Sequence, residues 1–424
     1  MKYLLTLIST LLLFASCEKK EDDGPVFTKK EASRAVMIYM AGENNLTATG
    51  GVRYLKNDLD EIVEGSKQLA DDQRVFVFVD SLGTTLNEKG KPYIIEVHGG
   101  QTYERKNYSE EFYSCDPDKF RDVISWMTDN IKAKAYGLVL WGHATGWIVE
   151  NDTIASNRRA YGLDDAKDGG NYLAKWMNIT QMASALKTLP KMDFIFADCC
   201  NMMGAEVGYE LRDVTDYLIG SPAEIPGPGA PYDLILPILF KNGSDLYRGI
   251  IDTYFNYYLQ AYNESSDPTI SFLRGYSVPM AVIDTKYMEQ LAQSTRDIVT
   301  TFAPEYPQTI NVDGIPFYIY VDAPLMFDMK ALIKKNATTE AYNAWEQAFN
   351  LAVPYHRMSQ KWMTIYPELM TSFYYFNAND NECSSVSMFI PMKLGAYTGG
   401  TYKYNATSNH FGWNRVIDWS RFGW

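Results

Sequence analysis

A histidine and a cysteine each follow a short apolar run of the kind that forms a buried strand. His143 comes shortly after the run at 138–140, and Cys200 comes shortly after the run at 194–197. In open α/β sheets, ligands gather at the carboxyl ends of strands, so an imidazole and a thiol placed there can meet across one crevice. Such a pair could act as a nucleophilic cysteine-histidine dyad. Either residue alone is more often a buried structural group.

The segment after Cys200 is predicted to be helical, because Val207, Leu211 and Val214 recur at helical spacing. A thiol near the N-terminus of a helix lies at the positive end of the helix dipole, which favours the thiolate. We therefore expect the pKa of Cys200 to lie below its usual value of about 8.5.

The residues around Cys200 resemble the nucleophile motif of the clostripain family of cysteine endopeptidases. That motif reads Asp-Ala-Cys-x-Met with a Glu-Val pair following, and the residues in register with it are Asp198, Cys200, Met202, Glu206 and Val207. The register selects Cys200 and not Cys199 as the nucleophile. The family's histidine motif, Trp-x-His-Gly-x-Gly-Trp, is similar to the segment at 141–147, with Ala144 where the family usually has glycine.

Other stretches of the chain resemble the same family, so the resemblance covers nearly all of the mature sequence. They are the segments at 36–46, 221–229, 386–391 and 413–414. The resemblance implies a caspase-like fold: an α/β/α sandwich with a mostly parallel central sheet and a C-terminal subdomain. It also implies that the backbone N–H groups of Ala144 and Cys200 bind the oxyanion of the tetrahedral intermediate.

Substrate preference is expected to depend on Asp198. An acid two residues before the nucleophile can pair with Arg or Lys of a substrate, and the alternative is that it caps the following helix. Some family members carry a second acid in the Pro-Gly-x-Gly stretch, but Pro228 stands at that position here. Glu224 is a candidate substitute. The resemblance therefore implies cleavage after Arg or Lys, with peptides or proteins as substrates.

The polar stretch at 150–171 is predicted to be an exposed loop between the two catalytic strands. Arg158 and Arg159 offer a dibasic site there at which the enzyme could process itself; the alternative is a loop that is never cut. By resemblance alone, the family also raises the alternative that activity depends on calcium. No compact calcium loop is visible, and Asp164, Asp165 and Asp168 are expected to be solvated loop acids. No cofactor is expected to be required.

The N-terminus resembles a bacterial lipoprotein signal. Lys2 precedes an apolar segment at 4–14, and small residues lead to Cys17, which would be acylated; the alternative is an ordinary cleaved signal. We expect an exported, lipid-anchored outer-membrane protein, on the cell surface or the periplasmic face, of the kind found in Bacteroidetes. The predicted divisions are a signal peptide at 1–16, a tether at 17–32, a peptidase core at 33–245 and a C-terminal subdomain at 246–424.

Strand and helix patterns alternate along the core, which indicates a mostly parallel sheet covered on both faces. The expected strands are 35–40, 75–80, 93–98, 137–141, 194–198 and 217–220. The expected helices are 52–64, 118–133, 179–188, 203–213, 246–262 and 284–303.

Composition narrows the function classes. The chain has 424 residues, 46% of them hydrophobic, which is enough for a full core, and its net charge of −13 argues against a nucleic-acid partner. Its 4 histidines include no pair at metal-binding spacing, and its 5 cysteines are too few for a disulfide scaffold. The rival class is a catalytically idle surface lipoprotein that binds glycan or protein, which 31 tyrosines and 9 tryptophans would suit.

Overall fold

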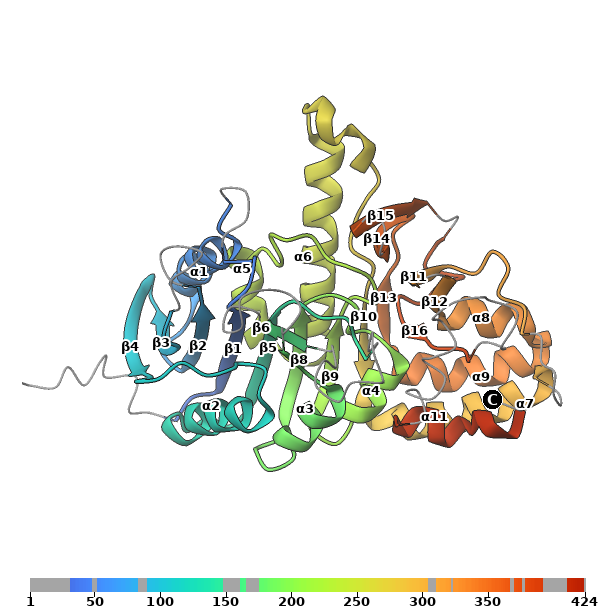
Figure 1. The fold of residues 1–424 in the computed structure, drawn as a ribbon, viewed down its shortest axis with the longest axis horizontal. Helices are drawn as coiled ribbons and strands as arrows, with labels where there is room; N and C mark the ends of the chain where they lie inside the picture. The colour runs from blue at the N-terminus through green and yellow to red at the C-terminus, as the bar shows by residue number, and fades with distance from the viewer. Residues whose placement is uncertain are drawn as a thin grey trace, which may run out of the picture.

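A nine-stranded sheet forms the centre of the molecule, in the order β13-β10-β9-β8-β5-β1-β2-β3-β4 (Figure 1). The five strands from β9 to β2 run parallel, and the strands on either side of them are antiparallel. The strands are β1 (Arg34–Gly42), β2 (Gln73–Ser81), β3 (Tyr93–His98), β4 (Gln101–Asn107), β5 (Tyr136–Gly142), β8 (Met192–Asp198), β9 (Thr215–Gly220), β10 (Met280–Asp284) and β13 (Tyr355–Arg357). This computed structural model describes residues 31–47, 52–82, 90–147, 161–164, 175–303, 310–321, 323–366, 370–375, 378–391 and 410–422.

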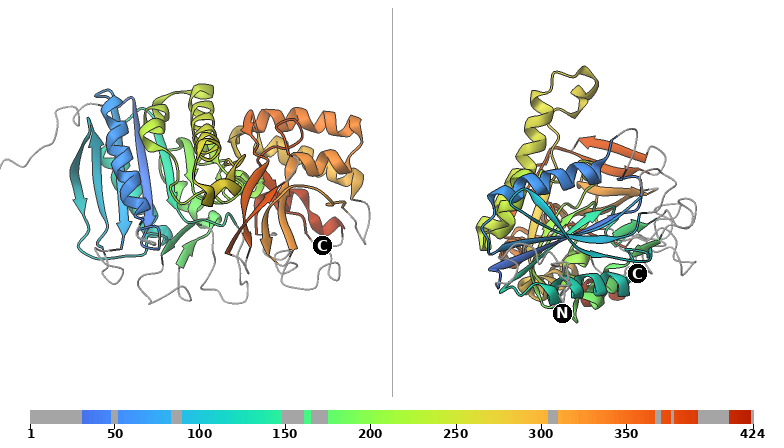
Figure 2. Two further views of the ribbon diagram at one scale, coloured as in Figure 1. Left: turned by 90° about the horizontal axis from the view of Figure 1, so that it is seen from above. Right: turned by 90° about the vertical axis from the view of Figure 1, so that its left-hand side faces the viewer.

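Helices cover both faces of this sheet, as the end-on view in Figure 2 shows. One face carries α2 (Pro117–Asn130), α3 (Ile179–Leu186) and α4 (Ala205–Leu211), and the other carries α1 (Tyr54–Gly65), α5 (Tyr232–Ile235) and α6 (Gly243–Glu264). The alternation of strand side chains divides the core in the same way. Tyr39 of β1 packs in one hydrophobic cluster with Phe120 of α2, whereas its neighbour Ile38 packs in the other with Ile62 of α1. All nine residues of β1 are buried, as expected for a strand covered on both sides.

The C-terminal part of the chain adds a second sheet beside the first, with strand order β15-β14-β11-β12-β16 (Figure 1). Its strands are β11 (Phe317–Val321), β12 (Ala323–Asp328), β14 (Lys361–Tyr366), β15 (Met370–Tyr375) and β16 (Ser387–Met388), and its helices are α7 (Met288–Phe302), α8 (Met329–Asn336), α9 (Thr339–Ala352) and α11 (Gly412–Ile417). Because β10 and β13 extend the central sheet, the two parts of the molecule share a continuous hydrophobic core.

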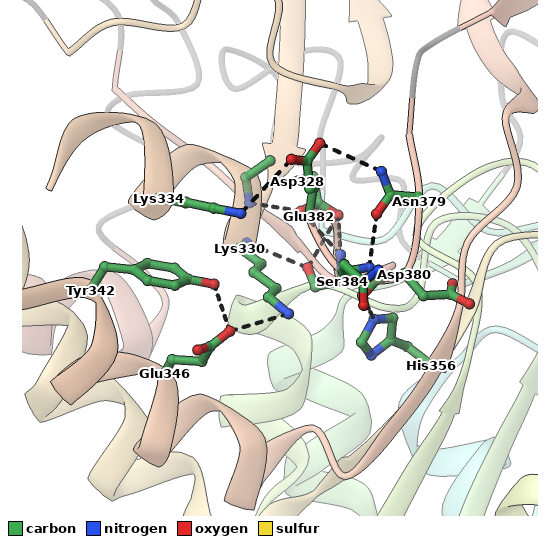
Figure 3. Close-up of polar contacts among 12 residues, drawn as sticks. Asp328, Lys330, Lys334, Tyr342, Glu346, His356, Asn379, Asp380, Glu382 and Ser384 are labelled. Atoms are coloured by element: carbon green, nitrogen blue, oxygen red, sulfur yellow. Dashed lines mark hydrogen bonds and ion pairs between the residues drawn. The ribbon is translucent and has the colours of Figure 1, made fainter. Parts of the chain in front are cut away.

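A polar network holds the segment that leads into β16 (Figure 3). Asp328, fully buried, caps α8 by accepting the N–H of Ala331 at 3.0 Å, and its other oxygen accepts the N–H of Ser384 at 2.9 Å. Lys330 pairs with Glu346 of α9 at 3.3 Å. A buried carboxylate that receives several hydrogen bonds fixes its donors in place, so this network anchors the chain before β16.

The anchored segment then docks on the loop that follows β8. The N–H of Ser387 donates to the carbonyl of Met203 at 3.0 Å, and the N–H of Phe389 donates to the carboxylate of Glu206 at 2.9 Å. The C-terminal part of the chain therefore supports the start of α4, close to Cys200.

The sequence predicted this fold class correctly: an α/β/α sandwich around a largely parallel sheet. It was wrong in one region: part of the stretch at 150–171 is not exposed loop. Tyr161–Asp164 forms a short strand, β6, which pairs with β7 (Lys175–Met177), and Asp164 is fully buried. Its four residues, Tyr-Gly-Leu-Asp, were too short a pattern to show a strand. Arg158, Arg159, Asp165, Asp168 and Cys17 lie outside the described residues.

Candidate active site

A pocket of about 280 Å³ lies at the carboxyl ends of β1, β5 and β8. It brings together the predicted histidine, cysteine and aspartate. Its lining consists of Asn45, Leu46, Tyr54, Trp141, Gly142, His143, Asp198, Cys200, Glu224, Ile225, Pro226, Gly227 and Gly229.

His143 is held by a residue from another strand end. Its Nε2 lies 2.6 Å from Oδ1 of Asn45, which follows β1. An amide oxygen can only accept, so the imidazole donates from Nε2 and keeps its lone pair on Nδ1. Burial lowers the pKa of His143 to about 4, so the ring is neutral at physiological pH. Asn45 was not predicted as a site residue, although its place just after a strand end was a usable signal.

Cys200 occupies the turn after β8. Its Sγ accepts the N–H of Ile225 at 3.4 Å, and the next residue, Asn201, has a left-handed backbone with φ 59°. Burial raises the pKa of the Cys200 thiol well above its usual range, and the nearby Glu224 carboxylate raises it further. The predicted lowering of this pKa was wrong, because α4 begins only at Ala205 and the thiol is desolvated.

The neighbouring Cys199 is fully buried in the core, whereas Cys200 is half-buried and lines the pocket. The thiol that the motif selects, Cys200, is therefore also the one that lines the pocket. Both are free thiols, as are Cys115 and Cys383.

Asp198 forms the floor of the pocket. Its Oδ2 accepts the N–H of Ala230 at 3.1 Å and the hydroxyl of Tyr232 at 2.8 Å, and its Oδ1 accepts the hydroxyl of Tyr254 at 3.1 Å. Burial raises its pKa to about 6 despite these donors. The alternative that Asp198 caps the following helix is wrong, because Gly204 is the N-cap of α4 and no side chain caps it.

A second carboxylate, missed at the sequence level, lies beside Asp198. Asp58 of α1 is 1% exposed and accepts the indole N–H of Trp141 at 2.5 Å. Burial, with the Asp198 charge, raises the pKa of Asp58 to about 9. Its spacing from Leu55 and Ile62 puts an acid on the buried face of α1, which was the available signal.

Gly229 fits against both carboxylates. It has φ +63°, and a Cβ there would lie 2.9 Å from Oδ2 of Asp198 and 3.4 Å from Oδ2 of Asp58. Only glycine takes this conformation and leaves that space open. The space between the two acids is thus kept by the Pro-Gly-x-Gly stretch, whose Pro228 is exposed and supplies no charge.

Glu224 lies on the pocket wall, where its backbone bridges to Met363 of β14. Burial raises its pKa to about 7. The pocket therefore contains a neutral imidazole, a neutral thiol and carboxyl groups that ionise near neutrality.

Comparison with known families settles the relationship of the chain. The sequence profile described as "Clostripain family" matches residues 38–422. The chain belongs to the clostripain family. It is therefore a cysteine protease of that family, and the resemblance noted from the motifs is confirmed for family and fold. Comparison with curated proteins gives no match.

Solved structures agree with this clostripain-family assignment. A secreted C11 cysteine protease from Bacteroides thetaiotaomicron, in complex with an irreversible peptide inhibitor, is 26% identical, with a TM-score of 0.73 over 92% of this chain and 99% of that chain. An inactive zymogen C11 protease from Parabacteroides distasonis is 23% identical, with a TM-score of 0.69 over the same shares. A further secreted C11 protease from B. thetaiotaomicron, iotapain, is 20% identical, with a TM-score of 0.70 over 92% of this chain and 99% of that chain.

In this clostripain-family chain, the histidine loop and the cysteine loop touch through backbone atoms. A Cβ on Gly146, which has φ +65°, would lie 2.5 Å from the carbonyl oxygen of Asn201. On its other side, the histidine loop receives β6: the N–H of Gly162 donates to the carbonyl of His143 at 2.9 Å, and Ala144 bridges to Tyr161. The position of His143 thus depends on both β6 and the turn that carries Cys200.

Proposed function

We propose that this protein is an endopeptidase in which Cys200 attacks the scissile carbonyl and His143 transfers the proton, with cleavage after Arg or Lys. The observation that carries the proposal is one pocket that contains the free thiol, the neutral imidazole and the Asp198 carboxyl. Neither reactive residue needs to move to another part of the molecule for the reaction.

The pKa shifts of His143 and Cys200 define the protonation state of the dyad before substrate binds. A raised thiol pKa and a lowered imidazole pKa leave both groups neutral, so no thiolate-imidazolium pair exists before substrate binds. As Sγ bonds to the carbonyl carbon, the thiol proton passes to Nδ1 of His143, and the imidazolium then protonates the leaving amine. Water, deprotonated by the same imidazole, hydrolyses the thioester and restores both groups.

The negative oxygen of the tetrahedral intermediate needs fixed donors. We assign this role to the backbone N–H groups of Cys200 and Ala144, which lie in the two loops that Gly146 packs together. The N–H of Ile225 already donates to Sγ and would stabilise the thiolate as it forms.

Preference for Arg or Lys follows from the pocket floor. A guanidinium or ammonium group that enters beside Asp198 would meet the Asp58 carboxyl across Gly229, while Glu224 faces it from the wall. The positive charge of the substrate side chain favours the ionised form of the three carboxyl groups, and the ionised carboxylates in turn attract the substrate. Asp58 and Glu224 together would then replace the acid that Pro228 lacks.

Export, lipid attachment and self-processing belong to the same proposal. The relatives described as secreted support export, and the Parabacteroides zymogen supports activation by cleavage. No helix in the described part of the chain is long and apolar enough to span a membrane. Cys17 would provide the lipid anchor, and Arg158 and Arg159 would provide the processing site. The binding-only alternative is disfavoured, because the profile of a protease family matches residues 38–422.

The test uses fluorogenic peptides that end in Arg, Lys or an uncharged residue. Cys200→Ala and His143→Ala should each abolish cleavage, while Cys199→Ala should keep most of it, since Cys199 packs in the core. Equal loss with Cys199→Ala would reject the assignment of the nucleophile. Equal rates on basic and uncharged peptides would reject the proposed specificity.

A further inference from the structure

A buried carboxylate lies behind the active site and has no part in the chemistry proposed above. Glu206, in the first turn of α4, is 0% exposed and is not among the residues that line the pocket around Cys200. Its Oε1 accepts the N–H of Phe389 at 2.9 Å. A carboxylate removed from water is costly unless donors surround it, so the groups that face Glu206 show what it holds together.

The indole of Trp147 is a further donor to this carboxylate. Burial raises the pKa of Glu206 to about 7, and three donors oppose this rise, namely the N–H of Phe389, the N–H of Glu206 itself and the indole of Trp147. Glu206 therefore lies between two segments that are far apart in the sequence. One ends the histidine loop, and the other belongs to the C-terminal part of the chain.

Trp147 anchors the histidine loop, whose described residues run from His143 to this tryptophan. Its side chain is 1% exposed. The ring packs edge to face on Phe389, with centroids 5.1 Å apart, and on Phe411, with centroids 5.0 Å apart. Packing of this kind restricts the plane of the indole, and a donor contact at its one polar atom restricts its rotation as well. The end of the histidine loop is therefore fixed by groups outside the pocket.

The start of α4 is also joined to the turn that carries Cys200. Met203, three residues after Cys200, accepts the N–H of Ser387 at 3.0 Å, and Gly204 bridges to the same serine. Glu206 thus lies where the histidine loop, the cysteine turn and the C-terminal part of the chain meet. A shift of its carboxylate would move the histidine loop relative to the thiol. Misplacement of a reacting group by about 1 Å can cost about a hundredfold in rate.

We propose that Glu206 is a positioning residue for proteolysis. By joining Trp147 to Phe389, it holds the loop that carries His143 against the turn that carries Cys200. It touches neither the substrate nor the reacting atoms, so it acts through His143. This role rests on the proposed function, in which His143 transfers the proton. The C-terminal part of the chain thereby supports the reaction, although both residues of the dyad come from the central sheet.

Glu206→Gln tests this role, because it changes the polar groups and keeps the size of the side chain. The amide oxygen can still accept the N–H of Phe389, but the amide N–H₂ then faces the indole N–H of Trp147, and two donors repel each other. We expect kcat to fall at least about tenfold with little change in KM, since His143 is displaced and no substrate contact is lost.

Glu210→Gln is the matched control, one turn further along α4. The carboxylate of Glu210 also accepts a backbone N–H from the C-terminal part of the chain, that of Gly412. An amide oxygen can accept this bond equally well, and the bond does not involve the histidine loop. Glu210→Gln should therefore leave kcat and KM unchanged. A loss of kcat of equal size in both variants would show that α4 acts only as a structural support and would overturn the proposal.

Trp147→Phe tests the same contact from the other side. It removes the indole N–H and keeps an aromatic ring against Phe389 and Phe411, so kcat should fall about threefold to tenfold at unchanged KM. In this background Glu206→Gln should cost little more, because the repulsion between two donors is gone. Such non-additive losses are the sign of a direct interaction. Losses that multiply independently would overturn the contact.

The position of His143 can also be followed without activity. In Cys200→Ala protein with isotope-labelled histidine, His143 is one of 4 histidines, and its resonances are assigned by His143→Ala. They should shift in Glu206→Gln and stay in place in Glu210→Gln. The Tm of each variant shows whether it is folded. If Glu206→Gln fails to fold, Trp147→Phe decides alone by the same two measurements.

The proposal requires both effects. A folded variant at Glu206 or Trp147 that keeps its kcat, or that loses kcat without a shift of the His143 resonances, would overturn the positioning role. Peptidase activity that persists in His143→Ala would instead reject the proposed function. The shift of the resonances would then still establish the contact between Glu206 and the histidine loop.

Discussion

At the scale of single residues, the neutral state of the proposed dyad of His143 and Cys200 defines what the neighbouring residues must do. His143 has a lowered pKa and Cys200 a raised one, so in the proposed mechanism the proton is transferred while Sγ bonds to the substrate. Rate then depends on whether Nδ1 points toward the thiol at that moment. Asn45 should fix this orientation through its contact with Nε2.

Asn45→Ala should therefore lower kcat by roughly 10–100-fold and change KM little, because it removes a positioning hydrogen bond and no substrate contact. Asn45→Asp should restore the orientation and also raise the pKa of His143, since a carboxylate favours the imidazolium. The acid limb of the kcat profile should then move to higher pH. Steady-state kinetics across pH would measure both changes, and an unshifted limb in Asn45→Asp would contradict the assigned contact.

If Asp198 binds the basic side chain of the substrate as proposed, cleavage after Arg or Lys should depend on pH. Below its pKa of about 6 the carboxyl is neutral and attracts a cation weakly, so kcat/KM for Arg and Lys peptides should rise as pH increases through 6. Glu224, with its pKa raised to about 7, should extend the rise. Asp198→Asn should lower kcat/KM for basic peptides roughly a hundredfold, about 3 kcal/mol, and remove the limb near pH 6. Peptides with an uncharged residue at the cleavage position are the control and should lack that limb in both proteins.

Asp58→Asn changes the charge and keeps the hydrogen bond, because the amide oxygen of Asn can still accept the indole N–H of Trp141. Asp58→Asn should lower kcat/KM for basic peptides about tenfold, as one rim of the cation site loses its charge. It should also raise Tm at pH 8. In the folded protein the pKa of Asp58 is raised to about 9, whereas in the unfolded chain it has its ordinary value. This difference lowers the stability of the folded protein progressively as pH rises from the unfolded pKa to about 9. Asp60→Asn, on the exposed side of the same helix, should change neither quantity.

At the scale of elements, the strand ends could be predicted and the packing between loops could not. Apolar runs marked β5 and β8, and the motifs placed His143 and Cys200 at their ends. The strand β6 was missed because its four residues carry no periodic pattern and are defined by contacts with the histidine loop. The pKa of Cys200 was wrongly predicted for a related reason: desolvation depends on which residues cover the thiol, and sequence spacing does not reveal that.

Contact between the two catalytic loops depends on Gly146. Gly146→Ala should lower stability by about 2–3 kcal/mol and lower kcat, because the new Cβ meets the carbonyl of Asn201 and the residue keeps a positive φ. Gly314→Ala is the matched control, because Gly314 has φ +71° and open space around it. Its substitution should lower stability by about 1 kcal/mol, through backbone strain alone. Urea unfolding and kcat of both variants would measure the difference. Equal effects would show that the loops tolerate the side chain.

At the scale of the whole molecule, lipid attachment and catalysis are predicted to be separable, because the first described strand, β1, begins at Arg34, after the predicted tether at 17–32. Cys17→Ala should release the protein from membranes or leave it unprocessed, since acylation needs that thiol. Detergent-phase partitioning measures the release. Peptidase activity of the released protein should match the wild type, and unchanged partitioning would reject the lipoprotein assignment.

Self-processing would divide the molecule between its two catalytic strands without separating the parts. β5, with His143, and β8, with Cys200, are neighbours in one sheet and share a hydrophobic core, so a cut chain stays assembled. Cleavage after Arg159 would leave a new chain that begins one residue before β6, whose Tyr161 is fully buried and whose Gly162 holds the histidine loop.

Purified wild type should therefore give two bands in denaturing gels, with a new N-terminus at Ala160, and a single peak in size-exclusion chromatography. Cys200→Ala should remain one chain, since it cannot cleave itself or its copies. Replacing Arg158 and Arg159 by Gln in an otherwise active protein should also keep it intact, and its kcat then measures how much activity depends on the cut. A single, fully active wild-type chain would show that maturation is unnecessary for this enzyme.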